Sequence, residues 1–513
     1  MAVLTVGSGQ QFGTVKAAVA ASHDGDTIYV QASAYLNDSA TINTKISIIG
    51  VGGMAHFVAD QPLANGKAFL VTNTNVNLDH LEFSGGADRD DNGAGVRYQG
   101  GNLTITNSYF HDNQDGLLAA TSSGGNLTIR NSEFGHNGTS DGLSHNLYVN
   151  EIGTLTVANS YLHDAVVGHE LKSRAANTVI LNNRIVDANG TASYSIDVPN
   201  SGNATIQNNI IQQGPNSENP QMISYGAETN KPQWPISSLL VESNTFVNQL
   251  TAPTARGVGN HNSGVTASIL DNHFYGLTAS QIASGNNVQT GDVMLSTAPA
   301  ISTAHPYVQS PWDDLISGGA GKDTLNGTAK HDLFVGGGGS DTFVIASGGS
   351  SDTIADFTPG TTAHDAVRLA GYNFSAFAGV KAAMAQHGAD VVLNLGNGET
   401  LTFQNLKLAA FVASDFSFAK TSLITSAQSL SLETSTPTST ASADSTGATL
   451  DSFAFPQGNV ADWHPGETLA GPAGLMEGAS ESGHVPATDV ALHAADLPDL
   501  APDLLHAGFD MFL

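Results

Sequence analysis

The sequence is dominated by an internal repeat between residues 66 and 275. Stacking NLTITNSYF, NLTIRNSEF, TLTVANSYL and NATIQNNII makes the repeat visible, and each unit begins with a short run of alternating apolar residues before a polar turn. One repeat position recurs every 23 to 35 residues and is occupied by His80, Asn107, Asn131, Asn159, Asn182, Asn208, Ser243 and Asp271. A repeat of this kind predicts a solenoid in which every coil adds short strands to parallel sheets.

The period, the β-branched strands and the stacked asparagines resemble the right-handed parallel β-helix of the pectate-lyase type. The resemblance implies that the asparagines lie at a tight turn and form hydrogen bonds from coil to coil. The segment TVKAAVAASHDGD has apolar residues at helical spacing, like the helix that caps such solenoids and protects their open edge. We therefore expect an all-β fold, with a right-handed parallel β-helix over residues 1–305 and a cap at about residues 10–35.

A second module is expected over residues 306–420. The run GGAGKDTLN, GTAKHDLFV, GGGGSDTFV contains three nine-residue units with Asp323, Asp332 and Asp341 in register. It resembles the RTX calcium-binding β-roll, in which glycines permit tight turns, carboxylates and carbonyls bind Ca²⁺, and one apolar residue per unit fills the core. The expected turn glycines are Gly319, Gly321, Gly337 and Gly339, and the expected core residues are Leu325, Leu333 or Phe334, and Phe343. The middle unit departs from the pattern at Thr328 and Lys330.

The remaining sequence, residues 421–513, reads as a Ser/Thr-rich linker followed by a disordered acidic tail. The tail ends in LPDLAPDLLHAGFDMFL, which resembles a type I secretion signal, and a plain flexible tail fits the composition equally well. The N-terminus lacks a basic region followed by an apolar one, and no membrane span is expected. A net charge of −29 disfavours nucleic acid as a partner. We therefore expect a secreted, extracellular protein that uses the type I secretion apparatus.

The stretch GHELKSRA supplies the candidate site. Glu170, Lys172 and Arg174 occupy alternate positions of one expected strand, so they would share a face. The chain has only 17 lysines and arginines in 513 residues, which makes this ridge unusual. The second strand of each coil is aligned on its apolar centre, at Val96, Leu118, Leu147, Leu171, Ile196, Ile223 and Val258. This alignment places Tyr148, Lys172 and Asp197 side by side on successive coils, with Arg174 one step further.

Two other interpretations of this stretch stay open. The first is that Lys172 and Asp197 form a surface salt bridge, which contributes only about 0–1 kcal/mol. The second is a strand phase shifted by one residue, which would turn His145 and His169 outward as an acid/base pair. The parallel sheets of a β-helix form a long, shallow trough that suits an extended polymer. Near this expected trough, the loop ADRDDN at residues 87–92 could bind calcium or be simply solvated, and Trp234 could provide a face for sugar stacking.

Such a cluster suits proton abstraction next to a uronate carboxylate. The carboxylate must be neutralised before a base can remove the C5 proton. In this hypothesis Lys172 is the base, Tyr148 the acid and Arg174 the group that neutralises the substrate, while Glu170 and Asp197 hold calcium or orient Lys172. The KS pair and nearby Arg174 resemble β-helix lyases of the alginate lyase and chondroitinase B type, and the order of β-helix and RTX units resembles mannuronan C5-epimerases. We expect a calcium-dependent lyase for an acidic polysaccharide, with a C5-epimerase or a non-catalytic glycan-binding surface protein as alternatives.

Overall fold

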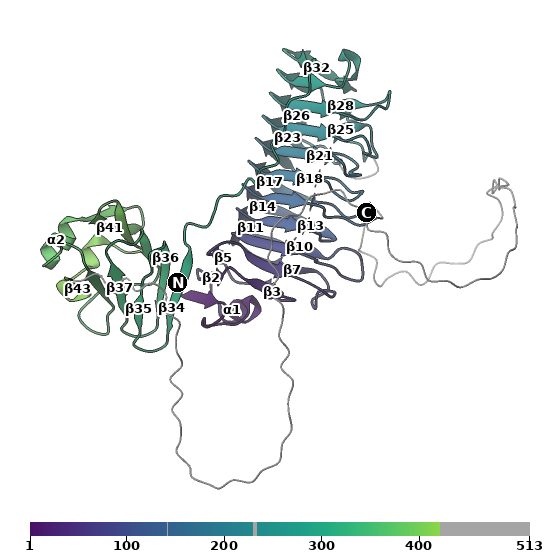
Figure 1. Ribbon diagram of the computed structural model, residues 1–513. Coiled ribbons are helices and arrows are strands. Elements are labelled where there is room, and N and C mark those ends of the chain that lie inside the picture. Colours follow the sequence, from purple (N-terminus) through teal and green to yellow (C-terminus); the bar gives the residue numbers. More distant parts are fainter. Residues whose placement is uncertain (141, 229–232, 421–513) are drawn as a thin grey trace, which may run out of the picture. The chain divides into compact units, whose positions relative to one another are not determined.

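The computed structural model describes residues 1–140, 142–228 and 233–420, and in these residues the repeat forms a solenoid with three parallel sheets (Figure 1). The 12-stranded sheet contains β1 (Val3–Val6), β2 (Thr27–Gln31), β5 (Ile46–Val51), β8 (Val76–Asp79), β11 (Asn102–Thr106), β14 (Ser122–Arg130), β17 (Ile152–Ala158), β20 (Asn177–Leu181), β23 (Asn203–Gln207), β26 (Ser238–Glu242), β29 (Ala267–Leu270) and β32 (Asn287–Thr290). The 10-stranded sheet contains β4 (Ala40–Ile42), β7 (Ala68–Thr72), β10 (Ala94–Tyr98), β13 (Asp115–Ala119), β16 (Leu147–Val149), β19 (Leu171–Ser173), β22 (Ile196–Val198), β25 (Gln221–Tyr225), β28 (Arg256–Asn260) and β31 (Ala283–Ser284). The 11-stranded sheet contains β3 (Ala34–Leu36), β6 (Ala55–Val58), β9 (Leu81–Ser84), β12 (Tyr109–His111), β15 (Glu133–Gly135), β18 (Tyr161–His163), β21 (Arg184–Asp187), β24 (Ile210–Gln213), β27 (Thr245–Asn248), β30 (His273–Tyr275) and β33 (Val293–Met294). The all-β solenoid predicted from the repeat is confirmed.

The recurring asparagine position lies at a corner of every coil. All eight residues of this position have φ between 48° and 57°, the left-handed region that asparagine and aspartate tolerate best. The side-chain ladder, however, is one residue further along than expected, and it contains Ser108, Ser132, Ser160, Asn183, Asn209, Asn244 and Asn272. Asn208 is exposed, whereas Asn209 is buried and bonds the amides of Asn183 and Asn244. The first residue therefore turns the chain, and the second provides the hydrogen bonds that the buried polar groups of the corner require.

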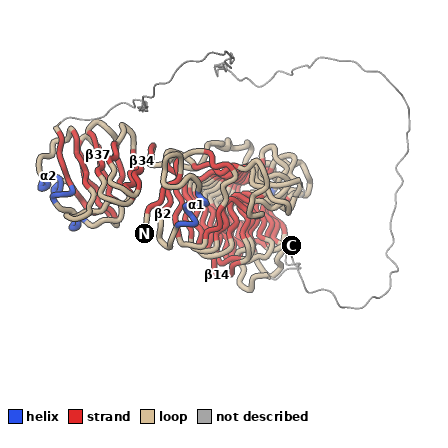
Figure 2. Tube along the Cα trace, turned by 90° about the horizontal axis from the view of Figure 1, so that it is seen from below, coloured by secondary structure: helices blue, strands red, loops and turns tan. Residues whose placement is uncertain are grey.

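The solenoid core is a continuous column of apolar side chains. Phe57, Phe83, Phe110 and Phe134 stack on successive coils with ring centroids 5.0, 4.9 and 4.5 Å apart, and all four are fully buried. Helix α1 (Val15–Ala21) covers the first coils by burying Val15 and Ala18 (Figure 2). The side chain of Thr14 caps this helix by accepting a hydrogen bond from the amide of Ala17. A short helix therefore covers the N-terminal end of the solenoid core.

Residues 314–419 form two further sheets. The six-stranded one contains β34 (Asp314–Gly319), β36 (Asp332–Gly337), β38 (Asp352–Ile354), β42 (Glu399–Phe403), β41 (Asp390–Gly396) and β40 (Met384–His387), and the four-stranded one contains β35 (Thr324–Asn326), β37 (Thr342–Ala346), β39 (Ala366–Ala370) and β43 (Phe416–Ala419). Helix α2 (Phe377–Ala382) lies between β39 and β40 in the chain. The nonapeptide strands alternate between the two sheets and pair in parallel, while β41 and β42 form an antiparallel hairpin around Gly396–Gly398.

The core of this second module shows whether Leu333 or Phe334 is the core residue of the middle unit. Leu325, Phe334 and Phe343 belong to one buried cluster, whereas Leu333 belongs to another. Phe334 is therefore the core residue of its unit. The linker and acidic tail predicted for residues 421–513 lie outside the described residues. Within the described part of the chain, helices are too short or too polar to span a bilayer.

Candidate functional site

The register of the 10-stranded sheet brings Tyr148, Lys172 and Asp197 to neighbouring positions on β16, β19 and β22. The Nζ atom of Lys172 lies 3.4 Å from Oδ2 of Asp197 and 5.9 Å from the centre of the Tyr148 ring. Tyr148 and Lys172 are half-buried and Asp197 is buried. One residue of the alignment was wrong. Leu117, and not Leu118, pairs with Leu147 in the core, so Leu118 faces outward between Arg97 and Tyr148.

Arg174 completes the cluster together with a residue that the sequence did not indicate. Its Nε atom donates to Oη of Tyr148 at 3.0 Å, and its two terminal nitrogens donate to the carboxylate of Glu228 at 2.7 and 2.8 Å. Lys172 also donates to Glu228, at 3.1 Å. We call Tyr148, Lys172, Arg174, Asp197 and Glu228 the trough cluster. Glu228 follows β25 in a long insertion, and no strand register predicts where such a loop returns.

Glu170 does not share the face of Lys172, which corrects the prediction from alternate positions. Strand β19 begins at Leu171, and the fully buried Glu170 lies before it at the corner. Its carboxyl group accepts hydrogen bonds from Nδ2 of Asn146 at 2.5 Å and from the amide of Ala165 at 2.9 Å. Burial, and next the charge of Asp187, raise the pKa of Glu170 to about 8. Glu170 therefore belongs to the buried hydrogen bonding of this corner and does not reach the surface.

The two histidines of the alternative strand phase are also buried. His145 and His169 are only 4% and 8% exposed, and the amide of His169 donates to Nδ1 of His145 at 2.9 Å. Burial, followed by the charges of His169 and Lys172, holds the pKa of His145 well below its usual value. Nε2 of His169 lies 3.4 Å from Oδ2 of Asp197. The histidines are thus buried beside the trough cluster, with His169 next to Asp197 and the ring of His145 5.3 Å from that of Tyr148.

The ion pair between Lys172 and Asp197 is more than an exposed salt bridge. Burial raises the pKa of Asp197, but the hydrogen bond and charge of His169 and the charge of Lys172 outweigh it, so the pKa is lowered. The Lys172 side chain is 14% exposed and that of Glu228 is 29% exposed. Trp234 lies beside the cluster, where its indole nitrogen donates to the carbonyl of Arg174 at 3.0 Å. The cluster is therefore an ordered network with its open side at Lys172 and Glu228.

The loop at residues 87–92 organises itself through Asp88. One carboxylate oxygen of this buried residue accepts the amides of Asp90 and Asn92 at 2.8 and 3.1 Å. Burial, the largest influence, lowers the pKa of nearby Arg97, against the charges of Asp115 and Asp88. The structure thus shows an internally bonded loop, and calcium binding there stays a prediction.

The nonapeptide turns of the second module offer oxygen ligands. Gly319 pairs with Gly337, so the first and third turns stack on each other, and Cβ atoms on Gly337 or Gly339 would collide with the carbonyls of Gly319 or Gly321. Oδ2 of Asp341 is buried without a hydrogen-bond partner among the described residues. An all-oxygen donor set with an unsatisfied carboxylate oxygen fits Ca²⁺.

The middle turn fits calcium less well. The amide and hydroxyl of Thr328 donate to the carboxylate of Asp332 at 2.6 and 2.8 Å, and Lys330 pairs with Asp314 at 3.3 Å. These bonds occupy the oxygens that an ion would need.

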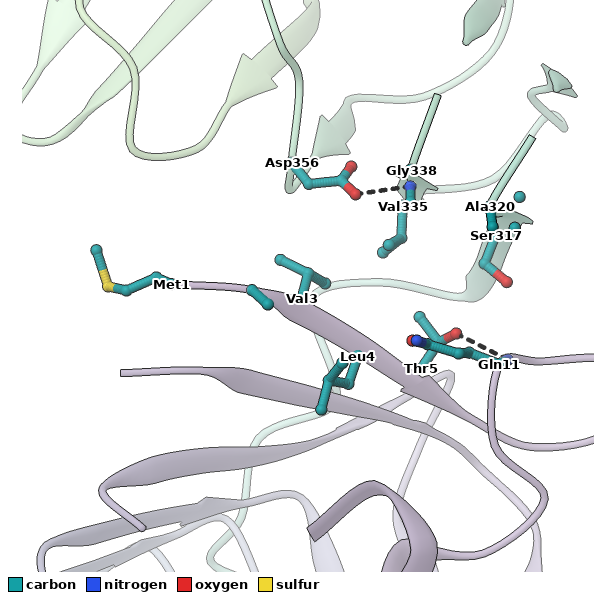
Figure 3. A pocket seen from close by; sticks show the side chains of 14 residues that line it. Met1, Val3, Leu4, Thr5, Gln11, Ser317, Ala320, Val335, Gly338 and Asp356 are labelled. Atoms are coloured by element: carbon teal, nitrogen blue, oxygen red, sulfur yellow. Dashed lines mark hydrogen bonds between the residues drawn. The ribbon is translucent and has the colours of Figure 1, made fainter. Parts of the chain in front are cut away.

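The pocket drawn in Figure 3 carries no comparable chemistry. It is lined by residues of β1, β34 and β36 and their neighbours, and among the lining residues Asp356 alone has a carboxylate. That carboxylate accepts the amides of Gly336 and Gly337 at 2.8 Å each. Asp356 therefore stabilises a turn of the second module.

A protein-family model agrees with this fold. Residues 63–217 match the family model described as right-handed β-helix region. The endo-1,3-1,4-β-glycanase EglC of Rhizobium meliloti (strain 1021) is 41% identical over 78 residues, so the match spans 15% of this chain and 16% of that protein's length.

Among solved structures, ORF18 of Geobacillus virus E2 is 14% identical, with 57% of this chain and 62% of that chain covered and a TM-score of 0.39. Pectate lyase Pel9A is 14% identical (59% and 82% covered, TM-score 0.35), and the PL6 family alginate lyase AlyGC is 12% identical (72% and 72% covered, TM-score 0.26). The family match and the three parallel sheets together establish that the repeat region is a right-handed parallel β-helix.

Proposed function

We propose that this protein is a secreted, calcium-dependent lyase that cleaves an acidic, uronate-containing polysaccharide by β-elimination at the trough cluster. The observation that carries the proposal is the convergence of Tyr148, Lys172 and Arg174 on one open face, with the Glu228 carboxylate held between the two cations. The fold and the brief match to a glycanase are consistent with a polysaccharide as substrate.

The carboxylate of Glu228 marks where a uronate carboxylate would bind. Arg174 holds it with two parallel hydrogen bonds, the geometry that recognises carboxylates most strongly. Because Glu228 is partly exposed and comes from an insertion, a substrate carboxylate can take its place on Arg174. Neutralising that carboxylate stabilises the negative charge that develops when the C5 proton leaves.

Tyr148 and Lys172 are the proposed proton-transfer pair, and the contacts favour an exchange of the roles predicted from sequence. Lys172 donates a hydrogen bond to Glu228 and pairs with Asp197, so it is placed as a proton donor. Oη of Tyr148 accepts a hydrogen bond from Nε of Arg174, so it is placed as an acceptor. In the proposed step Tyr148, acting as the tyrosinate, takes the C5 proton at Oη; the C5–H electron pair forms the C4–C5 double bond as the C4–O bond breaks, and the ammonium of Lys172 gives a proton to the departing oxygen.

Calcium enters the proposal through the second module. Asp323 and Asp341, with carbonyls of the turns around Gly319–Gly321 and Gly337–Gly339, would hold the ion and stabilise these stacked turns. Asp197 orients Lys172 and His169 in the structure, so we assign it no calcium.

The test is ultraviolet absorbance of the product formed from a panel of uronate polymers, in calcium and in chelator. Tyr148→Phe removes only Oη, and Lys172→Met removes the ammonium; we expect each to lower the rate about 10²- to 10⁴-fold. Lys45→Ala is the matched control, because Lys45 is exposed and pairs only loosely with Asp24 at 3.7 Å.

If the Tyr148→Phe variant forms unsaturated product as fast as the wild-type chain does, the assigned site is refuted. Absence of unsaturated product on every polymer would refute the lyase. Solvent exchange of the C5 proton, measured by NMR, would then indicate an epimerase, and binding without exchange a non-catalytic glycan-binding protein.

A further inference from the structure

A second cluster of chemically active side chains lies on the 11-stranded sheet, a different face from the trough cluster. His56 on β6, Glu82 on β9 and His111 on β12 come from three consecutive coils. Nε2 of His111 is 3.0 Å and Nε2 of His56 is 3.7 Å from the same oxygen, Oε1 of Glu82. All three side chains are partly exposed, between 17% and 29%.

The spacing of these atoms suits a metal ion. One donor atom from each residue lies within 4.8 Å of the others. Ligands about 2.0–2.1 Å from a tetrahedral Zn²⁺ are separated by roughly 3.4 Å, so small side-chain adjustments are sufficient to bind the ion. Two imidazoles and one carboxylate are also the ligand types that zinc prefers, whereas calcium selects oxygen donors.

The surroundings of His111 support the same conclusion. Its other ring nitrogen, Nδ1, is 2.7 Å from the carboxylate of Asp112. A carboxylate behind a metal-binding histidine fixes the ring and directs the remaining nitrogen at the ion. His56 is positioned by the hydroxyl of Ser84, 2.7 Å from its Nε2, a bond that the metal would replace.

A neighbouring group on this sheet arranges its histidines differently around a glutamate. Glu133 is 2% exposed and uses its two oxygens separately, one for His163 at 3.2 Å and one for His305 at 2.6 Å. The second ring nitrogen of His163, Nδ1, lies 3.1 Å from Oδ2 of Asp164. The imidazoles there bind different oxygens, whereas those of His56 and His111 converge on one.

We propose that His56, Glu82 and His111 form a zinc site that joins three coils of the solenoid, with a remaining coordination position open to solvent. The site is independent of the calcium proposed for the second module, because its donors differ.

The test is cobalt binding to the full-length chain, in excess calcium so that oxygen sites are filled. We expect one Co²⁺ with a visible absorption band that Zn²⁺ abolishes, and a zinc-dependent rise in the thermal unfolding midpoint. His111→Ala and the isosteric Glu82→Gln should lose both signals. His273→Ala is the matched control, since His273 is an exposed histidine on β30 of the same sheet.

Circular dichroism identifies any variant that fails to fold, and Glu82→Gln changes no side-chain volume. A wild-type chain without the band, or a folded His111→Ala chain that keeps the band and the zinc-dependent midpoint, would overturn the proposal.

Discussion

The buried carboxyl group of Glu170 makes a sharp prediction about stability and pH. Glu170 is fully buried, and burial raises its pKa from the ordinary value of 4.5 to about 8. The folded chain therefore keeps a proton on Glu170 at pH values where the unfolded chain has released it. Because the folded state binds more protons, the contribution of Glu170 is fully present below about pH 4.5 and is lost as the pH rises towards 8.

The expected magnitude is large. At about 1.36 kcal/mol for each pH unit, the rise from about pH 5 to about pH 8 should remove roughly 3–4 kcal/mol of the free energy of unfolding. Glu170→Gln has no titrating group, so the difference between the two chains isolates this residue from other buried acids such as Asp187. The amide nitrogen of glutamine cannot accept a hydrogen bond, and the variant should be about 1–3 kcal/mol less stable at about pH 5.

Urea unfolding of both chains in calcium, from about pH 5 to about pH 8, measures this difference. Across this pH range, the free energy of unfolding of the variant should rise by roughly 3–4 kcal/mol relative to that of the wild-type chain. The variant should therefore be the more stable of the two at about pH 8. Parallel stability curves would refute the reasoning, since they would mean that Glu170 is not held protonated in the fold.

Three further predictions concern the scaffold and the site. Asn209→Ala removes four buried hydrogen bonds to Asn183, Asn244 and Ile180, and urea unfolding should show a loss of about 3–4 kcal/mol in the free energy of unfolding. Asn208→Gly at the exposed corner should lose little, and equal losses in the two variants would contradict the ladder. Asp341→Asn should weaken the calcium-dependent rise in the thermal midpoint, unlike the exposed Asp60→Asn, and an unchanged rise would place the ion elsewhere. Glu228→Gln weakens the internal competitor for Arg174 and should lower KM for a uronate polymer about 3- to 10-fold; a raised KM would show that Glu228 positions Arg174 instead.

The local pattern of the sequence was sufficient for the strands and for part of the site. Alternating apolar residues determine which side chains of a parallel strand enter the core, and equal registers on neighbouring coils then bring Tyr148 beside Lys172 and Lys172 beside Asp197. The corner asparagines were also predictable, because few residues besides glycine adopt positive φ at low cost.

Only the tertiary structure decided what happens at corners and in insertions. The alternation of faces stops where β19 begins, so Glu170 turns inward although its spacing from Lys172 is that of a strand. Glu228 reaches Arg174 across 54 residues of sequence, and His111 reaches Glu82 across 29. The sequence by itself determined the repeating strands, because the alternation of apolar and polar residues along a strand is a local pattern. The partners of each charge depended on where loops return, which is settled by packing over the whole solenoid.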